Sequence, residues 1–422
     1  MRSAGRAADA SLTESAPSPV PATLREVALP LAATLAIQAL VALAIYSTPV
    51  MAPVAAPSLG LSPSAIGYFI ALAYLGSMVG SVTAGGWSAR FGPIRVSQVG
   101  LALCFGGLAM AASGWLPLVV LGAFIIGLGY GPTTPASSQI LVRAAPPSLI
   151  ALTFSIKQTG VPVGGAIAGA LVPALILLAG WRAAALTIGL ACVALALAIG
   201  PLRMRYDRAL NPGAPISLHS ALAPVGLVLR EPRLREMALA SFLYGGTQIT
   251  LVTYLVTFLT ETFAMTLVLA GLVMAVSQFS SVAGRLLWGV AADRLFARRT
   301  MLGLLGLGMG VAALLTLAAG PGWPIWLLFT FAAFFGATAV GWNGVYLAEV
   351  AHLAPPGQIG AATGGCLFFT FLGVVVTPLV FNLVFGFSGS YAVAYAVFGL
   401  PAIAIGARLL VAKVPAAARA AG

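Results

Sequence analysis

Lys157 is a cation within a long apolar run of this chain, and it stands beside Gln158 and Thr159. It lies about seven residues into that run, or about 10 Å along a helix. Ionisable side chains inside apolar spans are costly and often mark a solute pathway. Two interpretations stay open. Lys157 faces a central cavity and attracts an anion, or it extends to the membrane interface or pairs with Glu349. The polar neighbours favour the cavity.

Two short basic loops lie about 200 residues apart, each between long apolar runs. In both loops a residue with a short side chain stands four residues after a glycine and directly before an arginine. Further arginines follow. Segments 145–147 and 354–356 both read Ala-Pro-Pro and add a second correspondence. Repeated segments in so apolar a chain predict a membrane protein built from two similar halves. The loop residues are Gly85, Arg90, Gly92 and Arg95 in the first copy, and Gly289, Asp293, Arg294, Arg298 and Arg299 in the second.

The composition excludes an ordinary soluble domain. Of the 422 residues, 60% are hydrophobic and only 7% are charged, whereas a soluble domain averages about 25% charged residues. The longest polar gap, 203–235, is only linker-sized. The two histidines, His219 and His352, belong to no metal-ligand cluster in the sequence, and no nucleophile–base pair or phosphate-binding loop appears. We therefore expect neither an enzyme nor an ATP-driven pump, and no cofactor or metal.

The net charge of +12 is distributed as in a membrane protein and not as in a nucleic-acid-binding protein. The cations gather in alternate gaps between apolar runs, and Arg182 is the clear exception. This positive-inside pattern predicts that both termini lie in the cytoplasm. The expected location is the inner membrane of a bacterium.

The nine acids give the complementary signal, because none of them lies at the expected middle of the membrane. A proton-coupled exporter of cations usually needs a buried carboxylate. Its absence from the sequence pattern favours an anionic or neutral solute.

Apolar runs of about 20 residues predict membrane-spanning helices, because lipid requires the backbone to satisfy its own hydrogen bonds. We expect an all-α membrane protein with 12 transmembrane helices in two six-helix halves. The spans are expected near 27–49, 66–86, 96–114, 117–141, 150–176, 182–202, 236–259, 266–290, 300–319, 324–348, 359–383 and 390–411. The corresponding divisions are a disordered tail (1–24), an N-terminal bundle (25–202), a linker (203–235), a C-terminal bundle (236–412) and a second tail (413–422).

With these loops and spans the chain resembles the major facilitator superfamily along nearly its whole length. The family's loop motif combines a glycine, an acid and several bases between spans two and three, with a weaker copy between spans eight and nine. Gly289, Asp293 and Arg294 match the second copy, whereas Ala89 occupies the acidic position of the first. In the family that acid is thought to cap a neighbouring helix. The resemblance implies gating roles for the loop residues, for Arg285 and for Pro162 in the glycine-rich fifth span.

The resemblance also implies a substrate site between the halves and motion of the halves about it by alternating access. We expect a carrier of a small organic solute, favouring an anion such as a carboxylate, with a proton or counter-anion as the possible coupling partner. The alternatives are an exporter of drugs or hydrophobic metabolites and a transport-inactive sensor. A monomer in the bilayer, without nucleic acid, is expected. The candidate substrate-binding residues are Lys157, Gln158, Gln38, Tyr46, Tyr74, Tyr130, Gln139, Tyr244, Gln248, Gln278, Trp342 and Asn343.

Overall fold

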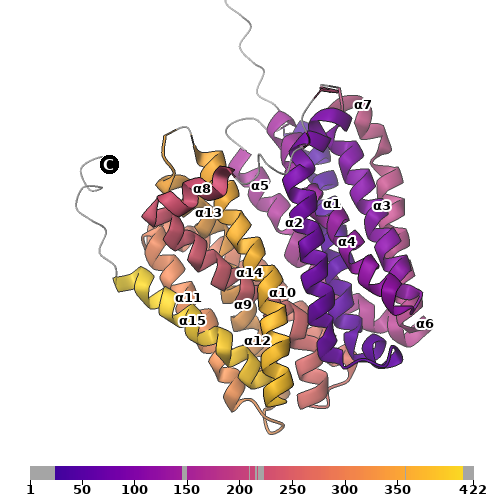
Figure 1. Ribbon diagram of the computed structural model, residues 1–422, viewed down its shortest axis with the longest axis vertical. Helices are drawn as coiled ribbons and strands as arrows, with labels where there is room; N and C mark the ends of the chain where they lie inside the picture. Colours follow the sequence, from indigo (N-terminus) through magenta and orange to yellow (C-terminus); the bar gives the residue numbers. More distant parts are fainter. Residues whose placement is uncertain are drawn as a thin grey trace, which may run out of the picture.

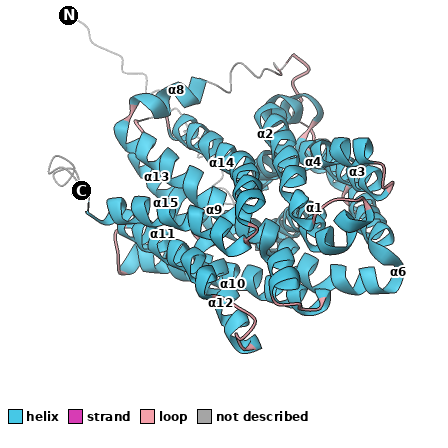
Figure 2. Ribbon diagram, turned by 60° about the horizontal axis from the view of Figure 1, so that its bottom comes forward, coloured by secondary structure: helices cyan, strands magenta, loops and turns pink. Residues whose placement is uncertain are grey.

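The computed structural model describes residues 24–144, 150–208, 210–213, 216, 223–356 and 358–411. The expected tails, apart from Leu24, and the Ala-Pro-Pro segment 145–147 lie outside these residues. The described residues form helices and loops without a strand (Figure 2). Helices are the expected result for long apolar segments, because each helix satisfies its backbone hydrogen bonds internally.

The N-terminal half contains the helices drawn in indigo to magenta on one side of Figure 1. A short 3-10 turn, η1 (Pro63–Ala65), joins the first two helices, and η3 (Gly200–Leu202) follows the last. The helices are α1 (Leu24–Ser58), α2 (Ile66–Phe91), α3 (Pro93–Ala112), α4 (Leu116–Ala144), α5 (Ile150–Gln158) and α6 (Gly160–Ala198).

The C-terminal half lies beside it and is drawn in red to yellow in Figure 1. Two short helices, α7 (Arg203–Tyr206) and α8 (Ala223–Arg230), lie between the two halves in sequence. The helices of this half are α9 (Pro232–Thr262), α10 (Leu267–Arg294), α11 (Arg298–Leu315), α12 (Ile325–Ala339), α13 (Asn343–Leu353), α14 (Ile359–Ser388) and α15 (Tyr391–Val411).

Eleven apolar helical segments among the described residues are long enough to cross a membrane, and one of them accounts for two crossings. Residues Ile156–Tyr206 make a segment of 51 residues, about 76 Å at helical rise, whereas the hydrocarbon core is about 30 Å thick. Gly180 breaks this segment with φ 81° and ψ 165°. The break separates the fifth crossing from the sixth, so the predicted total of twelve is confirmed.

Two predicted spans are interrupted. The fifth is divided at Thr159, between α5 and α6, and the tenth is divided at residues 340–342, between α12 and α13. Breaks within spans occur where the backbone is buried in protein or lines a cavity. Both breaks lie next to candidate site residues.

Glycines allow the helices of the N-terminal half to pack backbone to backbone. A methyl group on Gly127 would overlap the carbonyl oxygen of Ala73, and one on Gly131 would overlap that of Ser77. These two positions on α4 therefore allow α2 to approach closely, as small residues do in membrane helices.

The halves meet through α1, α2 and α6 on one side and α9, α14 and α10 on the other. Gly169 of α6 and Gly271 of α10 approach so closely that a side chain on either would overlap the other's carbonyl oxygen. Gly67 of α2 lies directly under the hydroxyl of Tyr254 and beside Asn382. Gly67, Gly271 and Asn382 all lie near the helix ends that are expected to face outward.

Candidate functional site

Lys157 lies at the end of α5 and is 1% exposed. Its Nζ donates hydrogen bonds to the carbonyl oxygen of Thr134, at 2.9 Å, and to Oγ of Ser138, at 3.2 Å. An ammonium has three donors, and both of these partners are neutral oxygens. Within the described residues Lys157 forms no ion pair with Glu349 or any other acid. The side chain is enclosed against α4 and does not extend to the surface.

Gln38 of α1 is fully buried and joins the same turn of α4. Its Oε1 accepts a hydrogen bond from Oγ1 of Thr134 at 2.9 Å, while its Nε2 has no partner in the described structure. Buried amide donors nearly always have a partner. Lys157 and Gln38 thus both bind Thr134 (the Lys157 cluster), and Nε2 of Gln38 is left without an acceptor.

Three tyrosines form the next layer along α1, α2 and α4. The hydroxyls of Tyr46 and Tyr74 lie 3.3 Å apart, and the rings of Tyr74 and Tyr130 meet edge to face at 5.9 Å between centroids. Tyr130 is one helical turn from Thr134, about 6 Å along α4. The tyrosine cluster therefore continues directly from the Lys157 cluster.

Arg285 reaches these residues from α10 of the opposite half. Its Nη1 donates to the carbonyl oxygen of Gln158 at 3.0 Å, and its Nε donates to that of Val340 at 3.3 Å. The guanidinium is also within electrostatic range of the phenol groups of Tyr46 and Tyr130. No ion pair of Arg285 occurs among the described residues.

Gln278 enters the same region from α10, two turns before Arg285. It is 1% exposed, and its amide packs on Gly165 beside the ring of Tyr46. Its Oε1 has no partner in the described part of the chain. The close contact at Gly165 explains why the fifth span needs a small residue here. Pro162, three residues earlier, is buried in the first turn of α6.

Lys157 and Arg285 are the central feature of this arrangement. They come from different halves: Lys157 binds Thr134 of α4, and Arg285 binds the backbone carbonyl of Gln158, the residue that follows Lys157. Their hydrogen-bond partners in the described residues are all neutral oxygens. A buried cation whose partners are all neutral is costly, and an anion bound beside it would lower that cost.

A separate group of candidates lies within the C-terminal half. Oε1 of Gln248 accepts from Nε1 of Trp342 at 3.1 Å and from Nδ2 of Asn343 at 3.2 Å. The hydroxyl of Tyr244 donates to the carbonyl of Leu302 at 3.0 Å. These bonds connect the break between α12 and α13 to α9, and they connect α9 to α11.

Gln139, the remaining candidate, lies on α4 of the N-terminal half and is half-buried.

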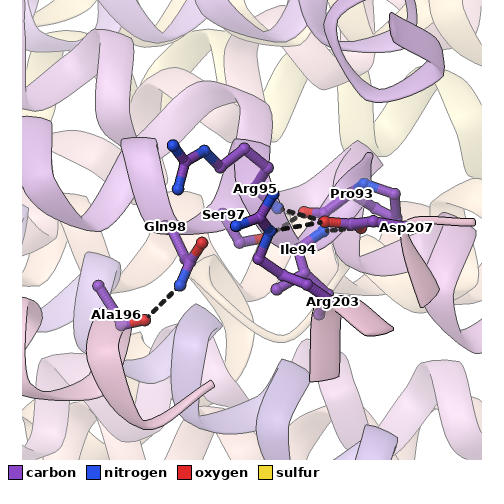
Figure 3. A network of polar contacts seen from close by, with 8 residues as sticks. All are labelled: Pro93, Ile94, Arg95, Ser97, Gln98, Ala196, Arg203 and Asp207. Carbon is purple, nitrogen blue, oxygen red and sulfur yellow. Dashed lines mark hydrogen bonds and ion pairs between the residues drawn. The ribbon is translucent and has the colours of Figure 1, made fainter. Parts of the chain in front are cut away.

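The first basic loop is held by an acid that the sequence did not associate with it (Figure 3). The carboxylate of Asp207, just after α7, accepts from the backbone N–H groups of Ile94 at 2.9 Å and Arg95 at 3.1 Å. It also lies 3.7 Å from Nε of Arg203. A carboxylate is favoured at a helix N-terminus because it satisfies free N–H groups and complements the helix dipole. Asp207 thus caps α3 where Ala89 supplies no acid.

Gly92 makes this cap possible. Its φ is +93°, and a side chain there would overlap the Asp207 carboxylate. The Gly92–Pro93 pair leaves α3 without a capping side chain of its own. That missing cap was a signal in the sequence for an acid from elsewhere.

The second basic loop is joined to its bundle through Arg299. Glu236, near the start of α9, forms ion pairs with Arg299 at 2.8 Å and with Arg408 of α15 at 3.1 Å.

Asp293, the motif acid, is exposed and has no bonded partner among the described residues. Arg90, Arg95 and Arg294 are exposed and Arg298 is half-buried, and side chains built on Gly85 and Gly289 would meet open space.

Comparisons with known proteins agree with this architecture. The family model of the Major Facilitator Superfamily matches residues 34–378. The probable sulfoacetate transporter SauU of Cupriavidus necator is 27% identical over 83% of this chain and 85% of its own length. The 4-hydroxybenzoate transporter PcaK of Acinetobacter baylyi is 31% identical over 31% of each chain. These relatives are transporters, and the expectation of a carrier and not an enzyme is confirmed.

A solved structure supports the fold. A POT family transporter in complex with 5-aminolevulinic acid superposes with a TM-score of 0.73 at 14% identity, over 90% of this chain and 95% of the other. Likeness at this identity concerns the fold alone. The family match, the twelve crossings and the two six-helix halves lead to one conclusion: this chain is a multi-pass membrane transporter of the Major Facilitator Superfamily.

Proposed function

We propose that this transporter is a secondary carrier of small organic anions, foremost carboxylates, that works by alternating access. The observation that carries the proposal is a pair of cations from opposite halves, Lys157 and Arg285, of which the second binds the backbone of the residue next to the first, with only neutral oxygen partners in the described residues. An anion between them would be attracted by both cations. Because each cation belongs to a different half, such an anion would also hold the halves together.

The unpartnered polar atoms support an oxygen-rich ligand. Nε2 of Gln38 lacks an acceptor that a carboxylate oxygen would supply. The hydroxyls of the tyrosine cluster, two of which are within electrostatic range of Arg285, offer further donors to a second polar end. A buried cation without an anionic partner costs several kcal/mol. Binding an anion would recover part of that cost.

The relatives suggest the first compounds to test. One is named for sulfoacetate and the other for 4-hydroxybenzoate, and both compounds carry an acidic group at one end and a second polar group at the other. We propose small carboxylates of this kind as the substrate class of the present chain.

Uptake into proteoliposomes tests the proposal. The panel contains labelled sulfoacetate, 4-hydroxybenzoate and acetate, and 4-hydroxybenzamide as the neutral partner of 4-hydroxybenzoate. We expect uptake of at least one anion, no uptake of the amide, and at least a tenfold loss in Lys157→Met. Arg182→Gln, which changes an exposed cation, serves as the matched control. Equal uptake of the amide, or full anion uptake by Lys157→Met, would rule out an anion site at Lys157.

We propose that the conformation seen is closed at its outer end. The close contacts at Gly67 and Gly271 support this, because they join the halves near the helix ends expected to face outward. The open space around Gly85 and Gly289 supports a less tightly packed cytoplasmic side. Arg285 would act as a gate as well as a ligand, since its bond to Gln158 crosses between the halves. A monomer with both termini in the cytoplasm, in a bacterial inner membrane, belongs to the same proposal.

A further inference from the structure

A groove of about 520 Å³ opens on the side of the N-terminal half, outside the site between the halves. Its walls come from α2 and α3, with Gly80 and Trp87 on one side and Val99 on the other. Leu128 and Pro132 of α4 form its floor. The volume is typical of small-molecule sites, yet none of the lining residues belongs to the Lys157 or tyrosine cluster.

The length of the groove matches one leaflet of a bilayer. From Phe91, at the cytoplasmic end of α2, to Gly80 the groove spans eleven residues, or about 16 Å of helix. Half of a hydrocarbon core of about 30 Å is about 15 Å. An acyl chain that enters beside Phe91 would therefore lie along the groove and end near the middle of the membrane.

The mouth of the groove is cationic and aromatic. Arg95 lines it, together with Trp87 and Phe91, whose rings stack at 5.5 Å between centroids. Trp87 is 41% exposed, as expected for an indole at the membrane interface. The side chain of Arg95 is exposed and has no bonded partner among the described residues.

The nearest acid does not neutralise Arg95. The Asp207 carboxylate is directed to the backbone N–H groups of Ile94 and Arg95, whereas the Arg95 guanidinium points away from it (Figure 3). Asp207 also lies near the guanidinium of Arg203. The charge of Arg95 is therefore available to a ligand at the mouth of the groove.

We propose that this groove binds an anionic phospholipid of the cytoplasmic leaflet, with the headgroup phosphate on Arg95 and one acyl chain between α2 and α3. A single basic side chain at an anionic membrane surface contributes about 1 kcal/mol. The groove thus combines a cationic mouth, interfacial aromatic rings and an apolar channel one leaflet deep. A soluble anionic substrate would interact only with the cationic mouth.

Native mass spectrometry of the purified full chain tests the site with phosphatidylglycerol and phosphatidylcholine of the same acyl chains. We expect phosphatidylglycerol to bind about fivefold more tightly, which corresponds to about 1 kcal/mol. Arg95→Gln should abolish that preference. Arg230→Gln, which changes an exposed arginine of α8 outside the groove, should retain it. Equal binding of the two lipids to the native chain, or an unchanged preference in Arg95→Gln, would overturn the headgroup assignment.

A second variant tests the acyl channel. Thr83 lines the groove, and Thr83→Trp should fill it while leaving Arg95 in place. We expect weaker binding of both lipids to this variant at an unchanged unfolding temperature. Glycerol 3-phosphate, which has the phosphate but no acyl chain, should fail to displace the lipid. Displacement by glycerol 3-phosphate, or normal lipid binding to Thr83→Trp, would show that the groove does not hold an acyl chain.

Discussion

At the residue scale, the sequence predicts that Lys157 is a site residue, whereas its hydrogen-bond partners follow only from the fold. Lys157 could be predicted as a site residue because an ionisable side chain within an apolar span needs a reason to be there. Its partners, the carbonyl of Thr134 and the hydroxyl of Ser138, could not be predicted, since they depend on how α4 packs against α5. The capping of α3 by Asp207 was not predicted, for a similar reason. Asp207 and α3 are more than 100 residues apart in sequence.

The cap on α3 gives a first prediction at this scale. Asp207→Ala should destabilise the protein by about 1 kcal/mol, a typical loss for a helix N-cap. Asp207→Asn should be milder because its amide oxygen still accepts one of the two hydrogen bonds. Thermal unfolding in detergent measures the difference. Equal stability of Asp207→Ala and the native chain would mean that the cap contributes nothing.

Gly92 gives a second prediction in the same loop. Gly92→Ala should lower the unfolding temperature more than Asp207→Ala does, because it strains a φ of +93° and displaces the carboxylate. Gly85→Ala is the control, since a methyl group there, near the end of α2, meets open space. A Gly92→Ala protein as stable as Gly85→Ala would contradict the geometry of the cap.

At the element scale, hydropathy predicts the spans well because the thickness of the bilayer sets their length. It does not predict where a span breaks. The interruptions at Thr159 and at residues 340–342 have a glycine beside or within them, Gly160 and Gly341. Glycines such as Gly127 and Gly131, however, lie inside the unbroken helix α4, so glycine alone does not mark a break. Tertiary packing decides these two positions. The boundary at Gly180, by contrast, was predicted, because the spans expected near 150–176 and 182–202 lie on either side of it.

Backbone contact between α2 and α4 gives a third prediction. Gly127→Ala should destabilise the N-terminal half by about 1–3 kcal/mol, the usual cost of overpacking, because its methyl group overlaps the Ala73 carbonyl. Gly106→Ala, in open space on α3, should be neutral or stabilising by up to about 1 kcal/mol. Thermal unfolding of the two variants side by side checks the contrast. A Gly127→Ala variant as stable as Gly106→Ala would show that α2 and α4 are not in backbone contact.

At the scale of the whole molecule, the repeat predicted two similar halves, and the fold and the family match confirm them. The repeat could not predict how the halves differ. The first loop takes its acid from Asp207, whereas the second is anchored through Glu236. The sequence placed Lys157 in the N-terminal half and Arg285 in the C-terminal half, but only the packing of α6 on α10 brings Arg285 to Gln158, the residue next to Lys157.

The contact at Gly271 gives a fourth prediction, at the scale of the halves. Gly271→Val should hold the outer ends of the halves apart, because its side chain overlaps the carbonyl of Gly169. Spin labels at Leu61 and Phe387, exposed positions near the outer ends of opposite halves, report their separation by pulsed electron resonance. We expect longer distances in Gly271→Val and native distances in Gly106→Val. Unchanged distances in Gly271→Val would mean that this contact does not close the outer end.

The central claim is that Lys157 and Arg285 share an anion between the halves. Equilibrium binding of the transported carboxylate to purified native, Lys157→Met, Arg285→Met and doubly substituted protein tests it most directly. We predict that each single change weakens binding at least tenfold, or by about 1.4 kcal/mol. The double change should cost clearly less than the sum, because both cations act on one ligand. Native affinity in either single variant, or strictly additive losses in the double variant, would contradict a shared anion site.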